Sequence, residues 1–288
     1  MKINVSLLIS GKLGFLVLKK LMNFCVIEHI ATDKNSLDII TFANKYKIPL
    51  FIGNPRKGKL ATFIKDNKTK ILLSINYLFL IEEDVISKFE FPINFHGSLL
   101  PKYRGRTPHV WAIINNEKKT GITAHFIDKD CDSGDILLQR GVDILEDDTG
   151  GSILEKFFEL YPKMVVEVIL QLDTKSYKRV KQNNNDATFY DKRTPVDGKI
   201  DWNWHKDRIR NWVRAQAQPY PGSFTYFNGE RIIIDKISYS NQGFNNDMPN
   251  GMVIKCNPKP IIKTPNGAVV LEEVRDKNIR FVKNKILK

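Results

Sequence analysis

The chain has 288 residues, of which 42% are hydrophobic and 27% are charged, and a formal net charge of +13. The hydrophobic fraction excludes an intrinsically disordered chain, and the length exceeds the usual single-domain size of about 100–150 residues. The three cysteines are scattered, which excludes a disulfide scaffold, and no apolar run approaches a membrane span of about 18 residues. We therefore predict a cytoplasmic protein of one large or two unequal domains, without a membrane partner.

The positive net charge is compatible with anionic partners such as nucleic acid or nucleotide diphosphates. The basic residues are scattered along the chain and form no run of about five like charges. A general lysine-rich composition gives the same total. Composition therefore favours small anionic ligands over a nucleic-acid interface.

The N-terminal part of the sequence alternates between strand-like and helix-like segments. Continuous apolar runs indicate strands that are buried on both faces of a parallel sheet. Strands that alternate with helices in this way indicate an α/β fold with a Rossmann-like, doubly wound, mostly parallel sheet. The expected strands cover residues 3–9, 25–31, 49–52 and 70–75, and the expected helices cover residues 15–21, 36–46 and 82–89.

The turn after the first expected strand contains Gly11 and Gly14. It lacks the GxGxxG spacing that lets a backbone approach a pyrophosphate, and it lacks the Gly-Lys-Ser/Thr ending of a P-loop. A tight turn between a strand and a helix explains these glycines, so no dinucleotide cofactor is expected.

A long amphipathic helix and a polar boundary follow further along the chain. Ser152 begins a capping-box motif, which predicts that the helix starts there, and Pro162 predicts a bend. The polar stretch 182–186 predicts a boundary between a larger domain over residues 1–182 and a smaller β-rich domain over residues 183–288. Short β-like runs in the second domain, forming a barrel or a sandwich, are expected at residues 232–234, 252–254, 261–262, 268–271 and 279–282.

Asn94 and His96 are separated by one residue in an apolar stretch. If this stretch is a strand, both side chains point to one face, near the carboxyl end where open α/β sheets bind ligands. An alternating segment follows at residues 121–127, and a polar loop that includes Asp128 and Asp132 comes after it. These two regions carry the candidate chemistry.

An amide, an imidazole and a carboxylate can together catalyse acyl transfer to an amine. The amide NH₂ of Asn94 is suited to stabilise the oxyanion of a tetrahedral intermediate, an effect worth about 3 kcal/mol. The imidazole of His96 can exchange the amine proton, while Asp132 can orient His96 or act as the base itself. The residues leave open which of the two is the base.

Other catalytic classes find less support in the sequence. Neither Ser98 nor Cys131 lies in a nucleophile elbow, so no covalent nucleophile is expected. The histidines show no HExxH-like spacing, and no metal site is expected. His125 shares a face with Thr123, and we interpret it as a residue that packs below the site.

The stretch from Asn94 to Gly105 reads Asn-Phe-His-Gly-Ser-Leu-Leu-Pro-Lys-Tyr-Arg-Gly, and an Asp-Ser-Gly-Asp-Ile motif begins at Asp132. This combination resembles the 10-formyltetrahydrofolate-dependent formyltransferases. The resemblance implies that Asn94, His96 and Asp132 are the catalytic residues and that 10-formyltetrahydrofolate is the cosubstrate, without a metal. It also implies a Rossmann-like domain followed by a smaller β domain. The folate contacts that it implies are Tyr77, Leu78, Phe79, Leu80, Ile81 and Asp128.

Methionyl-tRNA, glycinamide ribonucleotide and amino-sugar formyltransferases share this core, as do formyltetrahydrofolate hydrolases. Three stretches resemble the sugar-nucleotide branch, namely residues 104–111, 193–202 and 218–224. A guanidinium group binds phosphate oxygens in a bidentate way, which makes Arg106 and Arg193 candidates for the sugar-linked diphosphate, although exposed arginines are usually solvated. The substrate contacts implied by this branch are Arg104, Arg106, His109, Arg193 and Tyr220.

The resulting interpretation is an N-formyltransferase that acts on a nucleotide-linked amino-deoxy sugar. The expected substrate is a dTDP-activated amino-dideoxyhexose used in O-antigen and lipopolysaccharide biosynthesis. The resemblance also implies a homodimer and no nucleic-acid partner. Two alternatives stay open: a methionyl-tRNA formyltransferase, which binds tRNA, and a non-catalytic protein that binds folate or a nucleotide sugar.

Overall fold

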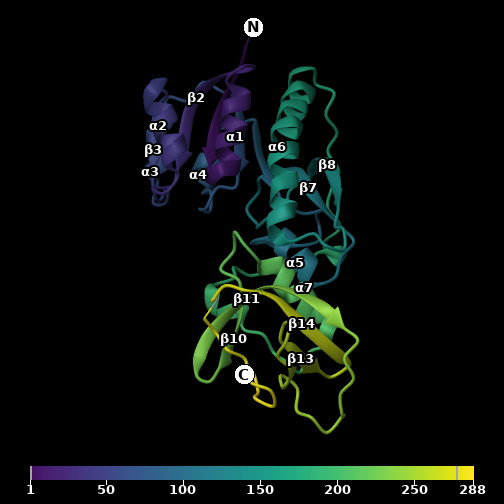
Figure 1. The fold of residues 1–288 in the computed structure, drawn as a ribbon. Coiled ribbons are helices and arrows are strands. Elements are labelled where there is room, and N and C mark those ends of the chain that lie inside the picture. The colour runs from purple at the N-terminus through teal and green to yellow at the C-terminus, as the bar shows by residue number, and fades with distance from the viewer. Residues whose placement is uncertain (1, 277) are drawn as a thin grey trace. The chain divides into compact units, whose positions relative to one another are not determined.

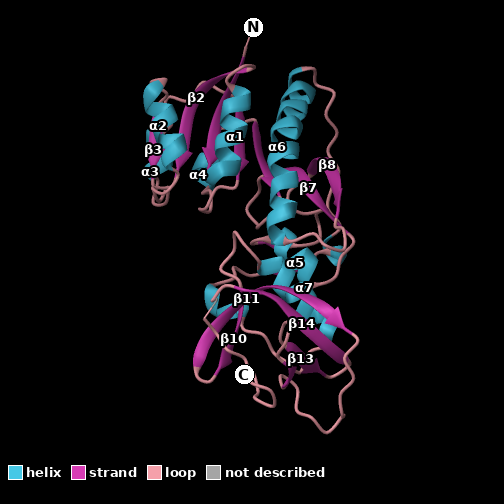
Figure 2. Cartoon of the chain, viewed as in Figure 1, coloured by secondary structure: helices cyan, strands magenta, loops and turns pink. Residues whose placement is uncertain are grey.

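The computed structural model describes residues 2–276 and 278–288, which fall into two compact units. The first unit contains the chain up to Gly105, together with Gly121–Val142 and Glu155–Tyr190. The second unit contains Arg106–Thr120, Asp143–Leu154 and Asp191–Lys288. Figure 1 labels the helices and many of the strands, and Figure 2 distinguishes the two kinds of element by colour.

A seven-stranded sheet forms the centre of the first unit, with the order β3-β2-β1-β4-β5-β7-β8. The strands from β3 to β5 in this order are parallel, and β7 pairs antiparallel with β5. This arrangement confirms the predicted α/β class with a Rossmann-like, mostly parallel sheet. The strands are β1 (Ile3–Ile9), β2 (Cys25–Thr32), β3 (Leu50–Ile52), β4 (Ile71–Ile75), β5 (Phe91–His96), β7 (Lys119–Phe126) and β8 (Ile136–Asp143).

A helix follows each of the first four strands in the chain. Phe15 of the first helix and Phe42 of the second contact edge to face, with ring centroids 5.8 Å apart. Leu7 in β1 and Leu73 in β4 are both 0% exposed, as expected for parallel strands that are covered on both faces. The helices are α1 (Gly11–Leu21), α2 (Leu37–Lys45), α3 (Lys59–Phe63) and α4 (Glu83–Ile86).

The long helix α6 covers Gly150–Asp173 and continues through Pro162 as one element. The predicted start at Ser152 is wrong, because Ser152 lies inside the first turn. Its backbone N–H donates to Oγ1 of Thr149 at 3.1 Å, and its hydroxyl donates to Oδ1 of Asp148 at 2.7 Å. Thr149 therefore takes the capping position that the motif assigns to Ser152.

The second unit is β-rich, as predicted for the C-terminal part of the chain. Its five-stranded antiparallel sheet has the order β10-β11-β14-β13-β12. The expected strand at residues 279–282 is wrong, because these residues are irregular and the ring of Phe281 packs on Phe227 with centroids 5.1 Å apart. The strands are β10 (Ser223–Phe227), β11 (Glu230–Ser240), β12 (Val253–Lys255), β13 (Ile261–Thr264) and β14 (Gly267–Val274).

Two helices complete the second unit, α5 (Pro108–Ile114) and α7 (Lys206–Gln216). The sequence pattern does not predict α7, because charged and polar residues surround its buried positions Ile209 and Val213. Across the chain apart from residues 1 and 277, we find no helix with both the length and the apolar character that crossing a membrane requires.

Candidate active site

Strand β5 places Asn94 and His96 on one face of the sheet. The alternate residues Ile93 and Phe95 point to the other face and are 0% and 2% exposed. β5 pairs with β7 so that Asn94 lies directly opposite His125. Residues opposite each other in a ladder share a face, so the two strands bring an amide and two imidazoles together.

Asp132 reaches this face from the loop after β7. Its Oδ1 lies 3.3 Å from Nδ2 of Asn94, and its Oδ2 lies 3.5 Å from Nδ1 of His96. Asp132 has a φ of +53°, which is uncommon for a residue that has a Cβ. The structure thus brings together the three side chains that the sequence predicts as catalytic.

The carboxylate of Asp132 is largely buried, and its side chain is 11% exposed. The backbone N–H of Gly105 donates to Oδ2 at 3.0 Å. Burial raises the pKa of Asp132, but the imidazole of His96 and the N–H of Gly105 outweigh it and hold this pKa well below its usual range. Asp132 is therefore an ionised acceptor at neutral pH.

The carbonyl oxygen of Tyr103 fixes the orientation of His96. Nε2 of His96 lies 2.8 Å from this oxygen. A carbonyl oxygen only accepts hydrogen bonds, so Nε2 carries a hydrogen and, in the neutral ring, Nδ1 holds the lone pair. Nδ1 is thus the atom that can take up a proton, and the resulting imidazolium would face Asp132.

His125 takes part in the site, although the sequence reasoning places it below the site. Its Nδ1 donates to the carbonyl of Phe126 at 2.8 Å, so the neutral ring offers Nε2 as an acceptor. Nε2 lies 3.1 Å from Nδ2 of Asn94 and 3.5 Å from Oδ1 of Asp132. His125 therefore orients the amide of Asn94. This contact follows from the pairing register of β5 and β7. The alternation of residues within one strand cannot predict that register.

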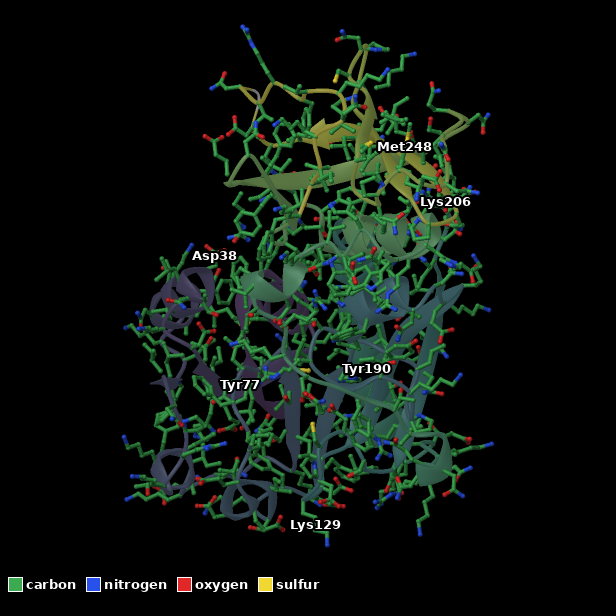
Figure 3. All side chains as sticks on the ribbon, turned by 90° about the horizontal axis from the view of Figure 1, so that it is seen from below. Asp38, Tyr77, Lys129, Tyr190, Lys206 and Met248 are labelled. Carbon is green, nitrogen blue, oxygen red and sulfur yellow. The ribbon has the colours of Figure 1, made fainter. Side chains whose placement is uncertain are left out.

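The first group of predicted folate contacts, residues 77–81, follows β4 and forms neither helix nor strand. Tyr77 and Phe79 pack against each other with ring centroids 5.4 Å apart, and Figure 3 labels Tyr77. The hydroxyl of Tyr77 is buried without a hydrogen-bond partner among the described residues. Leu78 and Leu80 are 44% and 58% exposed. Irregular backbone with exposed side chains suits a ligand that backbone groups hold.

Asp128, the remaining predicted folate contact, lies on the loop that carries Asp132. Its carboxylate accepts a hydrogen bond from the hydroxyl of Ser133 at 2.6 Å. The neighbouring Lys129 is exposed, and its side chain points away from the protein in Figure 3. Asp128 also lines a cavity of about 490 Å³ in the first unit. Other residues that line this cavity are Ile86, Pro92, Ile127, Arg179 and Gln182.

Arg104 is 3% exposed, and polar groups of the first unit hold its guanidinium. Nε and Nη2 of Arg104 donate to Oε1 of Gln182 at 3.2 and 2.7 Å. Nη2 also donates to the side-chain oxygen of Asn184 at 2.9 Å. These contacts favour a role inside the fold over the predicted contact with substrate.

The other four predicted substrate residues belong to the second unit. Arg106 is exposed. Nε2 of His109 and the hydroxyl of Tyr220 lie 2.5 Å apart, so these two predicted contacts form one pair. The structure thus joins two of the four directly.

Arg193 lies between two tryptophan rings of the second unit. Its guanidinium carbon is 4.8 Å from the ring centroid of Trp111 and 4.4 Å from that of Trp212. Nη2 donates to the carbonyl of Asp197 at 2.8 Å and to Oε1 of Gln216 at 2.7 Å. Arg193 therefore has a structural role in this unit, whatever else it binds.

The arrangement in the first unit offers an amide donor, an imidazole lone pair and an ionised carboxylate on one face of a sheet. These are the groups that acyl transfer to an amine uses. Within the described part of the chain, no group of three or more His, Cys, Asp or Glu side chains is placed to hold a metal ion.

Two parts of the chain match described families. Residues 27–169 match the formyl transferase family, and residues 192–284 match the formyl transferase C-terminal domain. The methionyl-tRNA formyltransferase of Caldanaerobacter subterraneus subsp. tengcongensis is 34% identical over 218 residues, which cover 75% of this chain and 70% of that protein. The chain belongs to the formyl transferase family.

Another relative of this formyl transferase is the bifunctional polymyxin resistance protein ArnA of Wigglesworthia glossinidia brevipalpis. It is 33% identical over 262 residues, which cover 87% of this chain. The match spans only 39% of the ArnA sequence. The likeness therefore concerns one part of a longer protein.

Two solved structures resemble this formyl transferase over nearly their whole length. WlaRD, a sugar 3N-formyl transferase solved in the presence of dTDP and 5-N-formyl-THF, has a TM-score of 0.73 at 23% identity and covers 96% of this chain and 99% of its own. The N-formyltransferase of Helicobacter canadensis, in complex with folinic acid and dTDP-3-aminofucose, has a TM-score of 0.73 at 20% identity, with 94% and 98% covered. At these identities the likeness establishes the fold, while the family establishes a formyl transfer enzyme.

Proposed function

We propose that this enzyme moves a formyl group from 10-formyltetrahydrofolate to the amine of a nucleotide-linked amino-deoxy sugar. The observation that carries the proposal is the convergence of Asn94, His96 and Asp132, with contacts of 3.3 and 3.5 Å from the carboxylate to the amide and the imidazole. Formyl transfer to an amine needs a donor for the oxyanion and an acceptor for the amine proton, and these side chains supply both.

The mutual coverage with the two sugar formyltransferases supports a sugar substrate. The match with WlaRD covers 96% of this chain and 99% of that chain. The Helicobacter canadensis enzyme, which was solved with dTDP-3-aminofucose, shows the same pattern. A dTDP-activated amino-dideoxyhexose is therefore the proposed substrate, with O-antigen and lipopolysaccharide synthesis as the proposed pathway.

Each of the three site residues has its own role in proton transfer or in stabilising charge. The folate cosubstrate, when bound, supplies the formyl carbon that the sugar amine attacks. Nδ2 of Asn94 donates to the oxygen on which negative charge develops. Nδ1 of His96 takes the amine proton and returns it to the nitrogen that leaves. The lowered pKa of Asp132 makes its carboxylate a weak base that stays ionised. Asp132 therefore stabilises the imidazolium of His96 and does not take the proton itself.

The loops around this site fit a folate. The buried hydroxyl of Tyr77 has no partner among the residues that the structure describes, and the irregular backbone of residues 77–81 suits a pterin. We assign residues 77–81 and Asp128 to the folate. Arg106 and Arg193 are the proposed diphosphate contacts, and His109 and Tyr220 are the proposed contacts to the rest of the nucleotide sugar.

An activity screen tests the proposal. The purified protein is incubated with 10-formyltetrahydrofolate and amino sugars linked to dTDP, UDP or GDP, with the amine at carbon 3 or carbon 4. Tetrahydrofolate release is followed by absorbance, and the formamide product is identified by mass spectrometry. A formylated dTDP-sugar supports the proposal, and no tetrahydrofolate release with any of these substrates contradicts it.

Methionyl-tRNA formyltransferase is a second candidate, because relatives of that name reach 36% identity, while the two sugar enzymes have 23% and 20%. A filter-binding titration with charged initiator tRNA separates the two functions. Micromolar or tighter binding that weakens steeply with salt would favour tRNA, since phosphate contacts release counterions.

The proposal extends to the domain limits and the assembly. Residues 1–182 form the proposed catalytic domain and residues 183–288 the proposed second domain, and the enzyme works as a cytoplasmic homodimer. Sedimentation equilibrium of the full chain at several concentrations tests the dimer. A monomer mass at all of them would contradict it.

A further inference from the structure

We infer that Gln182 is a positioning residue for Asp132, and that the buried Arg104 holds Gln182 in place for this task. The inference rests on the proposed function, in which Asp132 acts as an ionised carboxylate beside His96. Gln182 is the last residue before the proposed second domain. The sequence pattern identifies this position only as the start of a polar stretch, and the inference gives it a specific role.

Gln182 binds the backbone of the loop that carries Asp132. Its Nε2 donates to the carbonyl of Asp132 at 2.9 Å and to the carbonyl of Gly134 at 2.8 Å. Both amide hydrogens of Gln182 are thus used by this loop. Gln182 is 7% exposed, so water has little access to replace these bonds.

Arg104 determines which way the amide of Gln182 faces. Its Nε and Nη2 both donate to Oε1 of Gln182. A guanidinium has donors only, so the amide oxygen must face Arg104 and the NH₂ group must face the Asp132 loop. The next residue, Gly105, donates its backbone N–H to Oδ2 of Asp132 at 3.0 Å. The segment of Arg104 and Gly105 therefore acts on Asp132 twice, once directly and once through Gln182.

Asp132 needs such support because its backbone is strained. Its φ of +53° lies in the left-handed region, which a Cβ disfavours. The preceding residues Asp128 to Cys131 contribute an exposed stretch of the same loop. A strained residue keeps its conformation only where the surrounding contacts over-determine it. The bonds from Gln182 and Gly105 are contacts of this kind.

The test variant is Gln182→Glu, which keeps an oxygen for Arg104 and replaces the amide donor by an oxygen that repels two carbonyls. The shift of Asp132 away from His96 should lower kcat about 100-fold, the cost of a roughly 1 Å misplacement, while KM for both substrates stays within about twofold. Gln182→Met keeps the side-chain volume without adding charge and should act in the same direction. It also serves as the second variant if Gln182→Glu does not fold.

Gln171→Glu in α6 is the matched control. The amide of Gln171 contacts Glu167 of the same helix at 3.5 Å, so this change adds the same charge without touching the Asp132 loop. We expect wild-type kcat and KM for it. A wild-type kcat for both Gln182 variants would overturn the inference, and so would a raised KM with an unchanged kcat, because that split indicates a substrate contact.

Cys131 reports the position of Asp132 without any activity assay. Its exposed thiol donates to Oδ2 of Asp132 at 3.3 Å. A carboxylate at this distance opposes formation of the thiolate, which is the form that alkylating reagents attack. In Gln182→Met, the carboxylate should move away and alkylation of Cys131 by iodoacetamide should accelerate several-fold. Peptide mass spectrometry measures the rate, with Cys256 as the internal reference.

The two readouts keep the inference and the proposed function apart. Equal alkylation rates of Cys131 in the wild type and in Gln182→Met would overturn the positioning role, even for an enzyme that is active. Faster alkylation together with a wild type that formylates no amine would support the positioning role and contradict the proposed function.

Discussion

The amide Nδ2 of Asn94 lies 3.3 Å from Oδ1 of Asp132, which is 38 positions further along the chain. The same nitrogen lies 3.1 Å from Nε2 of His125. An amide NH₂ group has two hydrogens, so both are engaged. Asn94 must give up one contact before it can donate to an oxyanion, and we expect the longer one, to Asp132, to open.

Asn94→Ala should therefore lower kcat about 100- to 1,000-fold, the usual effect of removing one oxyanion donor. The fold should persist, because the buried residues Ile93 and Phe95 of β5 are not changed. Initial rates of tetrahydrofolate release and a thermal melt by circular dichroism measure the two effects.

The matched control for Asn94 is Asn4→Ala in β1. Asn4 is also a strand asparagine whose Nδ2 donates to a carboxylate, Oε1 of Glu28, at 2.8 Å. This variant should keep the wild-type rate. A folded Asn94→Ala protein with a near-native kcat would contradict the assignment of Asn94 as the oxyanion donor.

Asp132→Asn should lower the free energy of unfolding at neutral pH. The loss should be smaller in acid. The native pKa of Asp132 is held below its value of about 3.9 in an unfolded chain, so folding favours the ionised form. This stabilisation is fully present above about pH 4 and is lost as the pH falls through the lower native pKa. The wild type should exceed Asp132→Asn by about 2–3 kcal/mol in free energy of unfolding at neutral pH.

Urea unfolding at neutral pH and again near pH 3 measures this difference. The gap between the two proteins should narrow at the lower pH, because the carboxylate of the unfolded wild-type chain binds a proton there while the native carboxylate stays ionised. A gap that stays constant would show that the charge of Asp132 contributes nothing and that the amide merely packs less well.

The local sequence pattern was enough to predict the strands that are buried on both faces. β1 and β4 are covered on both faces, so each is a continuous apolar run that the sequence displays directly. Residues 279–282 show a similar apolar content but pair with no strand, because pattern alone does not supply a partner. Helix α7 was not predicted, because its charged residues obscure the apolar spacing of its buried positions.

The site shows the same division between local and long-range information. The alternation of Asn94 and His96 follows from one strand and could be predicted. The contacts of His125 and Gln182 depend on a strand register and on an amide that binds a distant loop, and no local motif encodes either. The catalytic roles of Asn94, His96 and Asp132 stay predictions until the variants are measured.

Gly105→Ala should weaken both the fold and the activity. A Cβ on Gly105 would lie 2.2 Å from the carbonyl oxygen of Tyr190, and the φ of Gly105 is +105°. The strain would separate β6 (Arg104–Gly105) from β9 (Phe189–Tyr190). It would also move the backbone N–H of Gly105 that donates a hydrogen bond to Asp132. We expect a loss of about 2–3 kcal/mol in free energy of unfolding and a kcat at least tenfold lower.

Gly229→Ala separates backbone strain from the steric clash at Gly105. Gly229 also has a positive φ, +87°, but its Cβ would meet no atom of the described residues within 4 Å. It should cost only about 1 kcal/mol and keep the wild-type kcat. Equal losses in both variants would mean that the contact with Tyr190 adds nothing.

Arg193→Ala should destabilise the second unit by about 2–3 kcal/mol, because it removes two cation–π contacts and the charged hydrogen bond to Gln216. Arg193→Lys keeps the charge but loses the planar stacking between Trp111 and Trp212, so an intermediate loss is expected. The exposed Arg106 offers the contrast, since Arg106→Ala should raise KM for the nucleotide sugar. Urea unfolding and steady-state kinetics on the three variants separate the two roles. If Arg193→Ala raises KM without any loss of stability, the tryptophan stack contributes nothing and this guanidinium serves the substrate alone.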